Sequence, residues 1–473
     1  MKLKPNPSLL AGATLALAGG VDSASAALNT YQWNGTTSTA WATGSNWSAS
    51  PGTGASGNST DSRLNVYNGA GQALVYTTSQ GTTVYANITG RGLVISSATG
   101  GIAGSMEITG GSFSTLGSAQ SDIIGNNATG ILTVSGTGAF IGSAAGTIVG
   151  LNSGGGTSTF TIGGSGSATV TTLQLSAATT VVNLDGGTLT ANQIVDVDNS
   201  GVTANSNTTF NFNGGTLTAG AGAATAFMTG LSNAYVKAGG AKIDTNGKDI
   251  TIGQALRHDT ALGATPDGGL SKSGAGTLSL SNTSTYTGAT TVTQGTLLIN
   301  GNITSSSLTT VKTGAVLGGS GSVGALTIEA GGTLAPGNSP GILNTGNYNQ
   351  AGTLSLELNG TTAGSGYDQI NVTGTVTLSG ALAASVAYTP INDQLLFILL
   401  NDGSDAISGT FSGLAQGGLV TFNGFDWRIS YTADSTGNTF TGGNDVALMA
   451  VPEPGVALLC GFGLLALLRR RRE

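Results

Sequence analysis

Short stretches of alternating apolar and polar residues, each containing glycine, recur along the first half of this 473-residue chain. Five of them are MEITGGSF (106–113), LTVSGTGA (132–139), FTIGGSGS (160–167), NLDGGTLT (183–190) and NFNGGTLT (211–218). Their equivalent positions are Ile108, Val134, Ile162, Leu184 and Phe212, which recur about every 25 residues. Spacings in this range are typical of a solenoid, in which each coil buries its apolar residues only against its neighbours.

Proline and glycine usage points to stacked strands. No proline occurs from Gly52 to Thr265, nearly half of the chain, while 80 residues of the chain are glycine. Proline cannot donate to a strand ladder, and Gly, Thr, Ser and Asn are poor helix formers. Glycine pairs supply the positive φ that coil corners need. We therefore expect parallel strands stacked into coils; a β-sandwich or a propeller, which also use short strands and glycine turns, remains the alternative.

Charge and cysteine content limit the classes of partner. Residues 27–450 contain 9 Lys and Arg against 19 Asp and Glu, a net charge of −10. We therefore expect no nucleic-acid partner and no attraction to an anionic lipid surface. The single cysteine, Cys460, lies beyond this segment. Stability must therefore come from packing and backbone pairing, because no disulfide can form within residues 27–450.

The N-terminus contains the three parts of a secretory signal peptide. Lys2 and Lys4 precede an apolar run at 8–20, and the small residues Ala24 and Ala26 follow it at the spacing that a signal peptidase requires. We expect cleavage between Ala26 and Ala27. The alternative is a first core helix of a cytosolic protein. Residues 1–26 therefore predict export.

The C-terminus, VPEPGVALLCGFGLLALLRRRRE (451–473), has the composition of a membrane tether. Its apolar part is Gly455–Leu468. As a helix of about 14 residues it would reach about 21 Å, short of the roughly 30 Å of a hydrocarbon core. Such a run inside a chain is more often a buried helix, but here two prolines precede it and four arginines form a cytoplasmic-type flank. We predict a short membrane helix that holds the preceding protein outside.

This tail resembles the PEP-CTERM sorting signal of Gram-negative bacteria. The residues that carry the resemblance are Val451, Pro452, Glu453, Pro454, Arg469, Arg470, Arg471 and Arg472. The resemblance implies that a membrane protease-transpeptidase called exosortase recognises the Pro-Glu-Pro, removes the tail and releases or transfers the protein to the cell surface, often alongside exopolysaccharide. The expected partners are thus exosortase, the export machinery and exopolysaccharide, with transient anchoring in the inner membrane.

The segment GGLSKSGAGTLSLSNTSTYTGATTVTQGTLLING (268–301) resembles the autotransporter-associated β-strand repeat. Its matching residues are Leu270, Lys272, Gly274, Gly276, Thr277, Leu278, Tyr286, Thr287, Gly288, Gly295, Thr296 and Leu297. GGTLAPGNSPG (331–341) and YDQINVTGTVTLSGAL (367–382) resemble segments that commonly follow it. The resemblance implies a right-handed parallel β-helix, as in autotransporter passengers. We expect no self-secretion, because the many alternating strands of a translocator barrel do not follow residue 450.

Four segments follow from these features: a signal peptide (1–26), β-helix repeats (27–365), a C-terminal β-rich cap (366–450) and the sorting and anchor segment (451–473). QLLFILL (394–400) and FDWRISY (425–431) supply the bulky residues of the cap. Trp33, Trp41 and Trp47 predict an aromatic cap on the first coil, with a sugar-stacking platform as the alternative.

Catalytic and metal signals are weak. The only histidine, His258, stands beside Asp259, but neighbours in sequence do not form a catalytic relay. Asp196, Asp198 and Ser200 alternate as calcium ligands do, yet the twelfth position is Asn207 instead of Glu. We interpret the first as a surface-loop histidine and the second as a solvated turn, and predict no catalytic residue, no cofactor and no metal.

The sequence thus predicts an exported, non-enzymatic β-helix at the cell surface or in the extracellular matrix, with a structural or adhesive role. Its Thr, Ser and Asn side chains would make weak, repeated contacts with polysaccharide or with neighbouring rods. The alternatives are a polysaccharide-degrading enzyme and a calcium-stabilised surface-layer protein.

Overall fold

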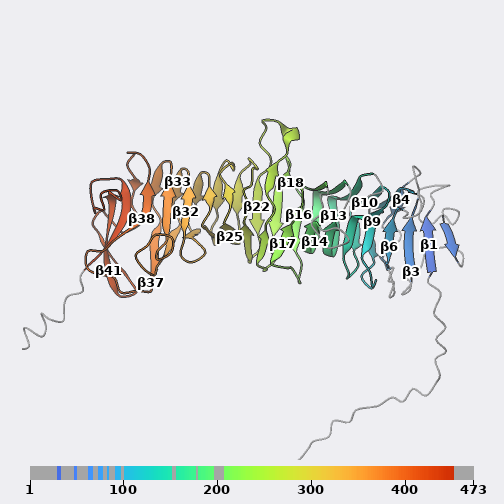
Figure 1. Ribbon diagram of the computed structural model, residues 1–473, viewed down its shortest axis with the longest axis horizontal. Helices are drawn as coiled ribbons and strands as arrows, with labels where there is room; N and C mark the ends of the chain where they lie inside the picture. Colours follow the sequence, from blue (N-terminus) through green and yellow to red (C-terminus); the bar gives the residue numbers. More distant parts are fainter. Residues whose placement is uncertain are drawn as a thin grey trace, which may run out of the picture.

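The computed structural model describes residues 29–33, 47–50, 62–67, 73–77, 82–84, 91–96, 101–151, 156–176, 179–196 and 207–451. Figure 1 shows a long rod of stacked strands, with β1 (Asn29–Trp33) near one end and β41 (Phe425–Ala433) near the other. Within the described segments the one helical element is the 3-10 turn η3 (Thr260–Leu262). The described part of the chain is therefore all-β.

Each coil contributes up to three strands, and the strands of successive coils pair in parallel to form three columns. Column 1 contains β4 (Leu74–Tyr76), β7 (Gly104–Ile108), β10 (Gly130–Val134), the first part of β13 (Ser158–Leu175), the first part of β14 (Thr180–Asp196), β15 (Thr208–Phe212), β18 (Asn233–Val236), β21 (Leu256–His258), and then β26 (Asn302–Ile303), β29 (Ser322–Val323), β32 (Ile342–Thr345), β35 (Gln369–Val372) and β38 (Leu395–Asn401). Tyr286 N donates to Leu256 O at 3.3 Å and Ser284 N to Asn302 O at 2.8 Å, which joins the two halves of this column.

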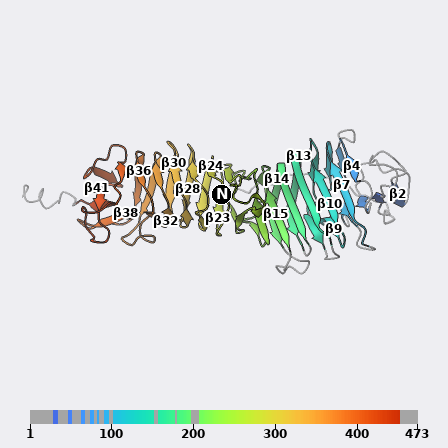
Figure 2. The ribbon, with the colours of Figure 1, turned by 90° about the horizontal axis from the view of Figure 1, so that it is seen from above.

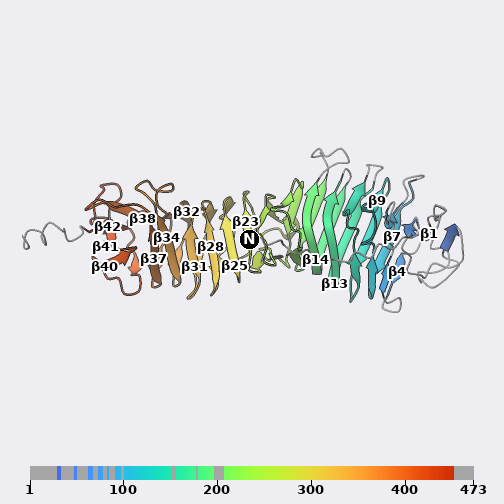
Figure 3. The same cartoon turned by 90° about the horizontal axis from the view of Figure 1, so that it is seen from below.

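The other two columns run along the remaining sides. Column 2 contains β5 (Thr82–Val84), β8 (Ser112–Ser114), β11 (Ala139–Ile141), the middle of β13 and β14, β16 (Thr216–Ala219), β19 (Ala241–Asp244), β22 (Leu270–Ser273), β24 (Thr290–Val292), β27 (Thr309–Val311), β30 (Leu326–Ile328), β33 (Tyr348–Gln350), β36 (Val376–Leu378) and β39 (Ser408–Gly409). Column 3 contains β1, β3 (Ser62–Val66), β6 (Leu93–Ile95), β9 (Asp122–Asn126), β12 (Thr147–Leu151), the ends of β13 and β14, β17 (Ala226–Thr229), β20 (Ile250–Ile252), β23 (Thr277–Leu280), β25 (Gly295–Ile299), β28 (Ala315–Gly319), β31 (Thr333–Pro336), β34 (Thr353–Leu358) and β37 (Ala381–Val386). Figures 2 and 3 show the strands lying side by side across the long axis, the arrangement of a parallel β-helix.

The predicted repeat is confirmed residue by residue. The five positions aligned from the sequence are direct Cα partners in column 1, in the order Ile108, Val134, Ile162, Leu184 and Phe212. The same ladder continues to Val236 and His258. The intervals between these positions in the sequence are therefore coil lengths.

The core is a set of inward-facing side chains stacked from coil to coil. In column 2, twelve consecutive partners are all buried: Phe113, Phe140, Ala168, Leu189, Leu217, Ile243, Lys272, Val292, Val311, Ile328, Gln350 and Leu378. Each step is about 4.8 Å, so no coil has a core of its own and cohesion comes from its neighbours. Ten of the twelve are apolar, and Lys272 and Gln350 are the exceptions.

The C-terminal end is closed by antiparallel strands. β38 pairs in parallel with β35 and antiparallel with β42 (Asp445–Ala450). β42 then pairs antiparallel with β41, and β41 with β40 (Leu419–Phe422). Trp427 is fully buried in this part of the sheet. The bulky segments 394–400 and 425–431 thus lie in strands of this closing sheet, although the domain boundary near residue 366 remains a prediction.

Several sequence-based predictions fall outside the described residues. These are the signal peptide with Ala24, Ala26 and Ala27, the sorting signal beyond Val451, and Trp41. Near the N-terminus, β1 pairs antiparallel with β2 (Trp47–Ser50) and parallel with β3, with Trp33 opposite Trp47 in the backbone register. A helix able to span a bilayer is not found in the described segments. The membrane helix predicted at Gly455–Leu468 lies beyond them and remains a prediction.

Candidate functional site

His258 is the last residue of β21, so the interpretation as a loop residue is wrong, and its partner is not its sequence neighbour. Its Nδ1 lies 2.8 Å from Asp267 Oδ2 and 3.2 Å from Thr287 Oγ1, and its Nε2 lies 3.1 Å from the carbonyl oxygen of Gly263. A catalytic relay needs the acid on one ring nitrogen and the nucleophile on the other. Here the carboxylate and the hydroxyl share Nδ1, so this group does not form a relay.

The contacts of His258 favour a protonated ring. A carbonyl oxygen and a carboxylate both accept hydrogen bonds, so both ring nitrogens donate when these contacts form. The hydrogen bond to Asp267 raises the pKa of His258. Burial acts to raise the pKa of Asp267, but hydrogen bonds from Thr287 N and from His258 outweigh it, and that pKa is lowered.

The same cluster holds a loop outside the rod. The loop of residues 259–267 projects from the rod between β21 and β22 and is the lime-coloured excursion in Figure 1. Asp259 pairs with Lys237 at 2.6 Å, and this hydrogen bond lowers the pKa of Asp259. Asp267 and Thr287 could not be identified as partners from the sequence, because only stacking brings Thr287 beside the loop.

Lys272 lies inside the rod, in the segment that resembles a known repeat. It occupies the inward column between Ile243 and Val292 and is fully buried. Its Nζ lies 3.1 Å from Thr245 Oγ1 in the preceding coil and 2.9 Å from Gln294 O in the next coil. It also contacts the carbonyl oxygens of its own corner: Ser273 at 3.1 Å, Gly274 at 2.5 Å and Gly276 at 2.7 Å.

This arrangement explains how a cation can lie in the core. At the corner the backbone ladder pairs only some carbonyls: Ser273 O accepts from Thr245 N at 3.1 Å and Gly276 O from Thr296 N at 3.3 Å. The remaining buried carbonyls need another donor. The ammonium supplies three N–H groups to three successive coils. Burial lowers the pKa of Lys272 to about 8. We interpret Lys272 as a structural residue that joins coils.

Buried carboxylates also join coils. Asp122 accepts hydrogen bonds from Leu93 N at 3.1 Å, Thr115 Oγ1 at 2.5 Å and Ser143 N at 2.8 Å. Burial raises its pKa to about 7. Asp368 accepts from Gly341 N and Glu357 N, both at 2.7 Å, and burial raises its pKa to about 6. Both side chains are enclosed and satisfied by backbone groups, so neither faces a substrate.

The calcium hypothesis rests on residues that are only partly described. Asp196 is buried, and its Oδ2 accepts from Thr208 Oγ1 at 2.7 Å. Asp198 and Ser200 lie outside the described residues. No group of three or more His, Cys, Asp or Glu suited to a metal ion occurs in the part of the chain that the structure describes.

The outer surface of column 2 carries a ladder of hydroxyl groups. Its consecutive partners are Ser167, Thr188, Thr216, Lys242, Ser271, Thr291, Thr310, Thr327, Asn349, Thr377 and Ser408. None of them is buried. Nine of these side chains are Ser or Thr, spaced by about 4.8 Å along the rod. This hydroxyl ladder is a long, regular polar surface.

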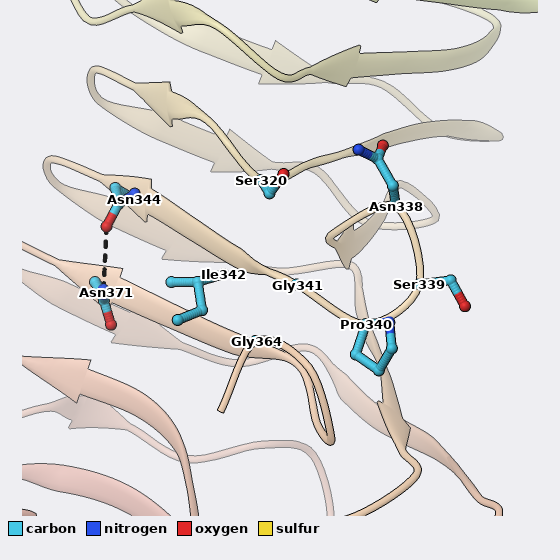
Figure 4. A pocket seen from close by; sticks show the side chains of 9 residues that line it. All are labelled: Ser320, Asn338, Ser339, Pro340, Gly341, Ile342, Asn344, Gly364 and Asn371. Carbon is cyan, nitrogen blue, oxygen red and sulfur yellow. Dashed lines mark hydrogen bonds between the residues drawn. The ribbon is translucent and has the colours of Figure 1, made fainter. Parts of the chain in front are cut away.

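A hollow of about 520 Å³ lies on column 1. Its floor includes Ile342, Asn344 and Asn371, and its edge is the loop 337–341. Figure 4 shows Ile342 between the hydrogen-bonded Asn344–Asn371 pair and the loop residues Asn338, Ser339 and Pro340. The loop belongs to the segment GGTLAPGNSPG, whose sequence resembles segments that commonly follow the autotransporter-associated repeat but predicted no site.

Comparison with known proteins finds a family match for one segment of this chain. Residues 270–299 match the family model of the Passenger-associated-transport-repeat. The match includes Lys272 and covers strands β22 to β25, so the predicted resemblance of this segment to an autotransporter-type repeat is confirmed.

One curated relative gives a second, partial match. It is the protein named Extracellular serine protease from Serratia marcescens, which is 44% identical over 77 residues. That segment is 16% of this chain and 7% of the relative, so the chain spans only a small part of the relative's length. A passenger-associated repeat and an extracellular relative both point to an exported or surface protein.

Proposed function

We propose that this chain is an exported structural or adhesive rod of the cell surface or extracellular matrix, a right-handed parallel β-helix released or anchored through its C-terminal tail. The observation that carries the proposal is the continuous stack of columns 1 to 3, closed at its C-terminal end by β40 to β42. In such a stack nearly every residue contacts a neighbouring coil. It is suited to spanning distance and to displaying repeated surface groups.

The position of Val451 supports attachment by one end. β42 ends at Ala450, and Val451 N donates to Asp426 O at 2.8 Å in the closing sheet. A segment that follows Val451 therefore starts at the end of the rod opposite β1 (Figure 1). A tether there would hold the rod with its N-terminal end outward. In this proposal exosortase cuts at Pro452-Glu453-Pro454 and removes Arg469–Arg472.

The hydroxyl ladder supports contact with exopolysaccharide. Serine and threonine hydroxyls both donate and accept hydrogen bonds, as sugar hydroxyls do. A single such contact is weak, but repeated contacts along one polymer raise the overall affinity through effective concentration. The net charge of −10 in residues 27–450 favours an uncharged polymer over an anionic one.

A hydrolytic enzyme is the second candidate, favoured by the name of the Serratia relative, Extracellular serine protease. A Ser-His-Asp mechanism needs a histidine with one nitrogen on a nucleophile and the other on an acid. His258 is the only histidine of this chain, and its Nε2 faces the Gly263 carbonyl. This geometry favours the structural role. Proteolysis and polysaccharide-degradation assays on the purified full chain would decide between the two.

Cell fractionation tests the sorting route. Cells with and without exosortase are separated into inner membrane, surface and medium, and the C-terminus of the protein is identified by mass spectrometry. The proposal predicts surface or medium material without Arg469–Arg472, and retention of the intact tail in the inner membrane when exosortase is absent. An unchanged location with an intact tail would refute the sorting route.

A calcium-stabilised surface-layer protein is the third candidate, based on Asp196 and Asp198. It predicts that a chelator lowers the melting temperature of the purified chain. An unchanged melting temperature in excess chelator would exclude calcium as a stabiliser.

A further inference from the structure

The hollow on column 1 arises where the coils become longer. Along column 2 the step in residue number is 17 from Val311 to Ile328, 22 from Ile328 to Gln350 and 28 from Gln350 to Leu378. The extra residues enter at one corner, in the loop 337–341 between β31 and β32 and in the segment 359–368 between β34 and β35. The insertions of these two neighbouring coils therefore contribute the sides, or walls, of the hollow, through residues 338–341 and Gly364.

The first wall is held in a fixed conformation. Gly337 and Gly319 exchange two backbone hydrogen bonds of 2.8 Å. Gly341 N donates to the enclosed Asp368, and Ser339 Oγ donates to Glu357 Oε2 at 2.5 Å. Ser339 has a positive φ of 101°, which is unfavourable for a residue with a side chain. Strained backbone held by several contacts is found preferentially at ligand sites.

The floor offers neutral polar groups beside apolar ones. Asn371 Nδ2 donates to Asn344 Oδ1 at 3.0 Å, and Asn344 Nδ2 donates to Gly321 O at 3.3 Å. The Oδ1 of Asn371 has no hydrogen-bond partner among the described residues. This oxygen has almost no exposed surface, so a ligand in the hollow would contact the other amide and hydroxyl groups of the lining.

The chemistry of the lining selects the class of ligand. Amides, hydroxyls, Pro340 and Ile342 line the hollow, and no charged side chain is among the lining residues. Pockets with an apolar surface and a few placed hydrogen-bonding groups bind small polar molecules. An anion would find no cationic partner here. A sugar ring, with apolar C–H faces and hydroxyls at its edge, matches both kinds of group.

We propose that the hollow bounded by loop 337–341 binds an uncharged saccharide unit of a polysaccharide. This inference rests on the proposed surface role and adds a defined site to it. The hydroxyl ladder lies on column 2 and the hollow on column 1, so the two surfaces contact different parts of a glycan.

The test compares one variant that fills the hollow with one matched control. Ser320 borders the hollow directly after β28, and Ser281 is the equivalent residue directly after β23, outside the lining. Both are exposed. Ser320→Trp fills the hollow, whereas Ser281→Trp adds the same side chain to the same corner elsewhere. Asn338→Ala removes one amide from the edge. Circular dichroism and thermal melting verify that each variant remains folded.

Binding is measured by calorimetry on the full chain in mild detergent, with cellohexaose, laminarihexaose and xylohexaose as uncharged probes and oligogalacturonate as the anionic probe. We expect at least one uncharged hexasaccharide to bind with a Kd of roughly 0.1–1 mM, as is typical of few-contact sites. Ser320→Trp should weaken it at least tenfold, Asn338→Ala should weaken it severalfold, and Ser281→Trp should leave it unchanged.

Three results would overturn the proposal. The first is that an uncharged probe binds with the same affinity to the Ser320→Trp variant. The glycan would then bind to another surface, and the proposed function would still hold. The second is tighter binding of oligogalacturonate than of the uncharged probes. The third is no binding of any uncharged probe at millimolar concentration. The sorting route is tested separately by the location and C-terminus of the protein in cells.

Discussion

At the residue scale, the rod depends on a few polar side chains that satisfy backbone groups at the corners. Lys272 donates to carbonyls of its own and the next coil and to a hydroxyl of the preceding one, and Asp122 and Asp368 accept from backbone N–H groups of neighbouring coils. Strand ladders use up most backbone groups, but corners leave some pointing inward. A charged group is tolerated in the core where it meets several of these at once.

Replacement of Lys272 tests this role. Lys272→Met keeps the apolar stem and removes the donor, so the carbonyls of Gly274 and Gln294 lose the ammonium, and Gly276 O keeps only its bond from Thr296 N. We expect a loss of about 2–4 kcal/mol, the range for an unsatisfied buried network. Urea unfolding monitored by circular dichroism measures the change.

Lys242→Met is the matched control, because Lys242 is exposed on the adjacent strand of the same column. It should change the unfolding midpoint little, as surface substitutions usually do. Equal midpoints for the two variants would show that the ammonium of Lys272 contributes nothing to stability.

The His258 cluster predicts a dependence on pH. The pKa of His258 is raised in the folded chain by its hydrogen bond to Asp267. The stabilisation is therefore fully present below the unfolded-state pKa of about 6.5 and is lost as pH rises through the folded-state pKa. Hydrogen exchange of residues 259–267 should be slower at pH 5.5 than at pH 8.5, after correction for the intrinsic rate.

His258→Gln provides the control for this effect. Its side chain keeps a hydrogen-bonding group but does not titrate, so the corrected difference between the two pH values should disappear. A corrected difference that persists in the variant would assign the pH dependence to another group.

At the element scale, coil corners demand glycine for two different reasons. Some corner glycines have a positive φ, as Gly274 does, whereas others have no space for a side chain. A Cβ on Gly276 would lie 2.0 Å from Lys248 O in the preceding coil, while one on Gly253 would meet only atoms 3.8 Å or more away. Neither residue has a positive φ, so only the steric reason separates them.

Two substitutions isolate the steric reason. Gly276→Ala should lower the free energy of unfolding by at least about 2 kcal/mol, because overpacking forces two coils apart. Gly253→Ala should be neutral or stabilise by up to about 1 kcal/mol through the unfolded state. The measurement is again the urea midpoint. Similar midpoints for both variants would contradict the close approach of the two coils at Gly276.

Periodicity in the sequence predicted the coils well, because one inward position recurs at every turn. Ile108 to Phe212 pair in the register that the alignment required. The hollow was not predicted, because its walls are coil insertions whose position on the rod is known only after stacking. Lys272 was recognised as part of a motif, but a lysine at an alternating position gives no sign that it points inward. Asp267 was missed because the neighbouring Asp259 offered a nearer candidate.

At the scale of the whole molecule, stability is a sum over neighbouring coils instead of one compact core. Every described strand of columns 1 to 3 pairs only with strands of the coils before and after it, apart from the antiparallel pairs near the two ends. The distance between two residues on one column therefore depends on the number of coils between them. Their separation in sequence matters little, because the coil from Ile243 to Lys272 is much longer than the coil from Val311 to Ile328.

Distances between spin labels on the hydroxyl ladder test this central claim most directly. Cys460→Ser removes the native cysteine. Three double variants then each carry Thr188→Cys together with Thr291→Cys, Thr327→Cys or Thr377→Cys, and spin labels are attached to the two cysteines. The last three sites lie 4, 6 and 8 ladder steps from the first. At about 4.8 Å per step, backbone separations of about 19, 29 and 38 Å follow. Pulsed electron paramagnetic resonance that gives this linear series would support the stacked rod, and distances that fail to grow with the number of coils would contradict it.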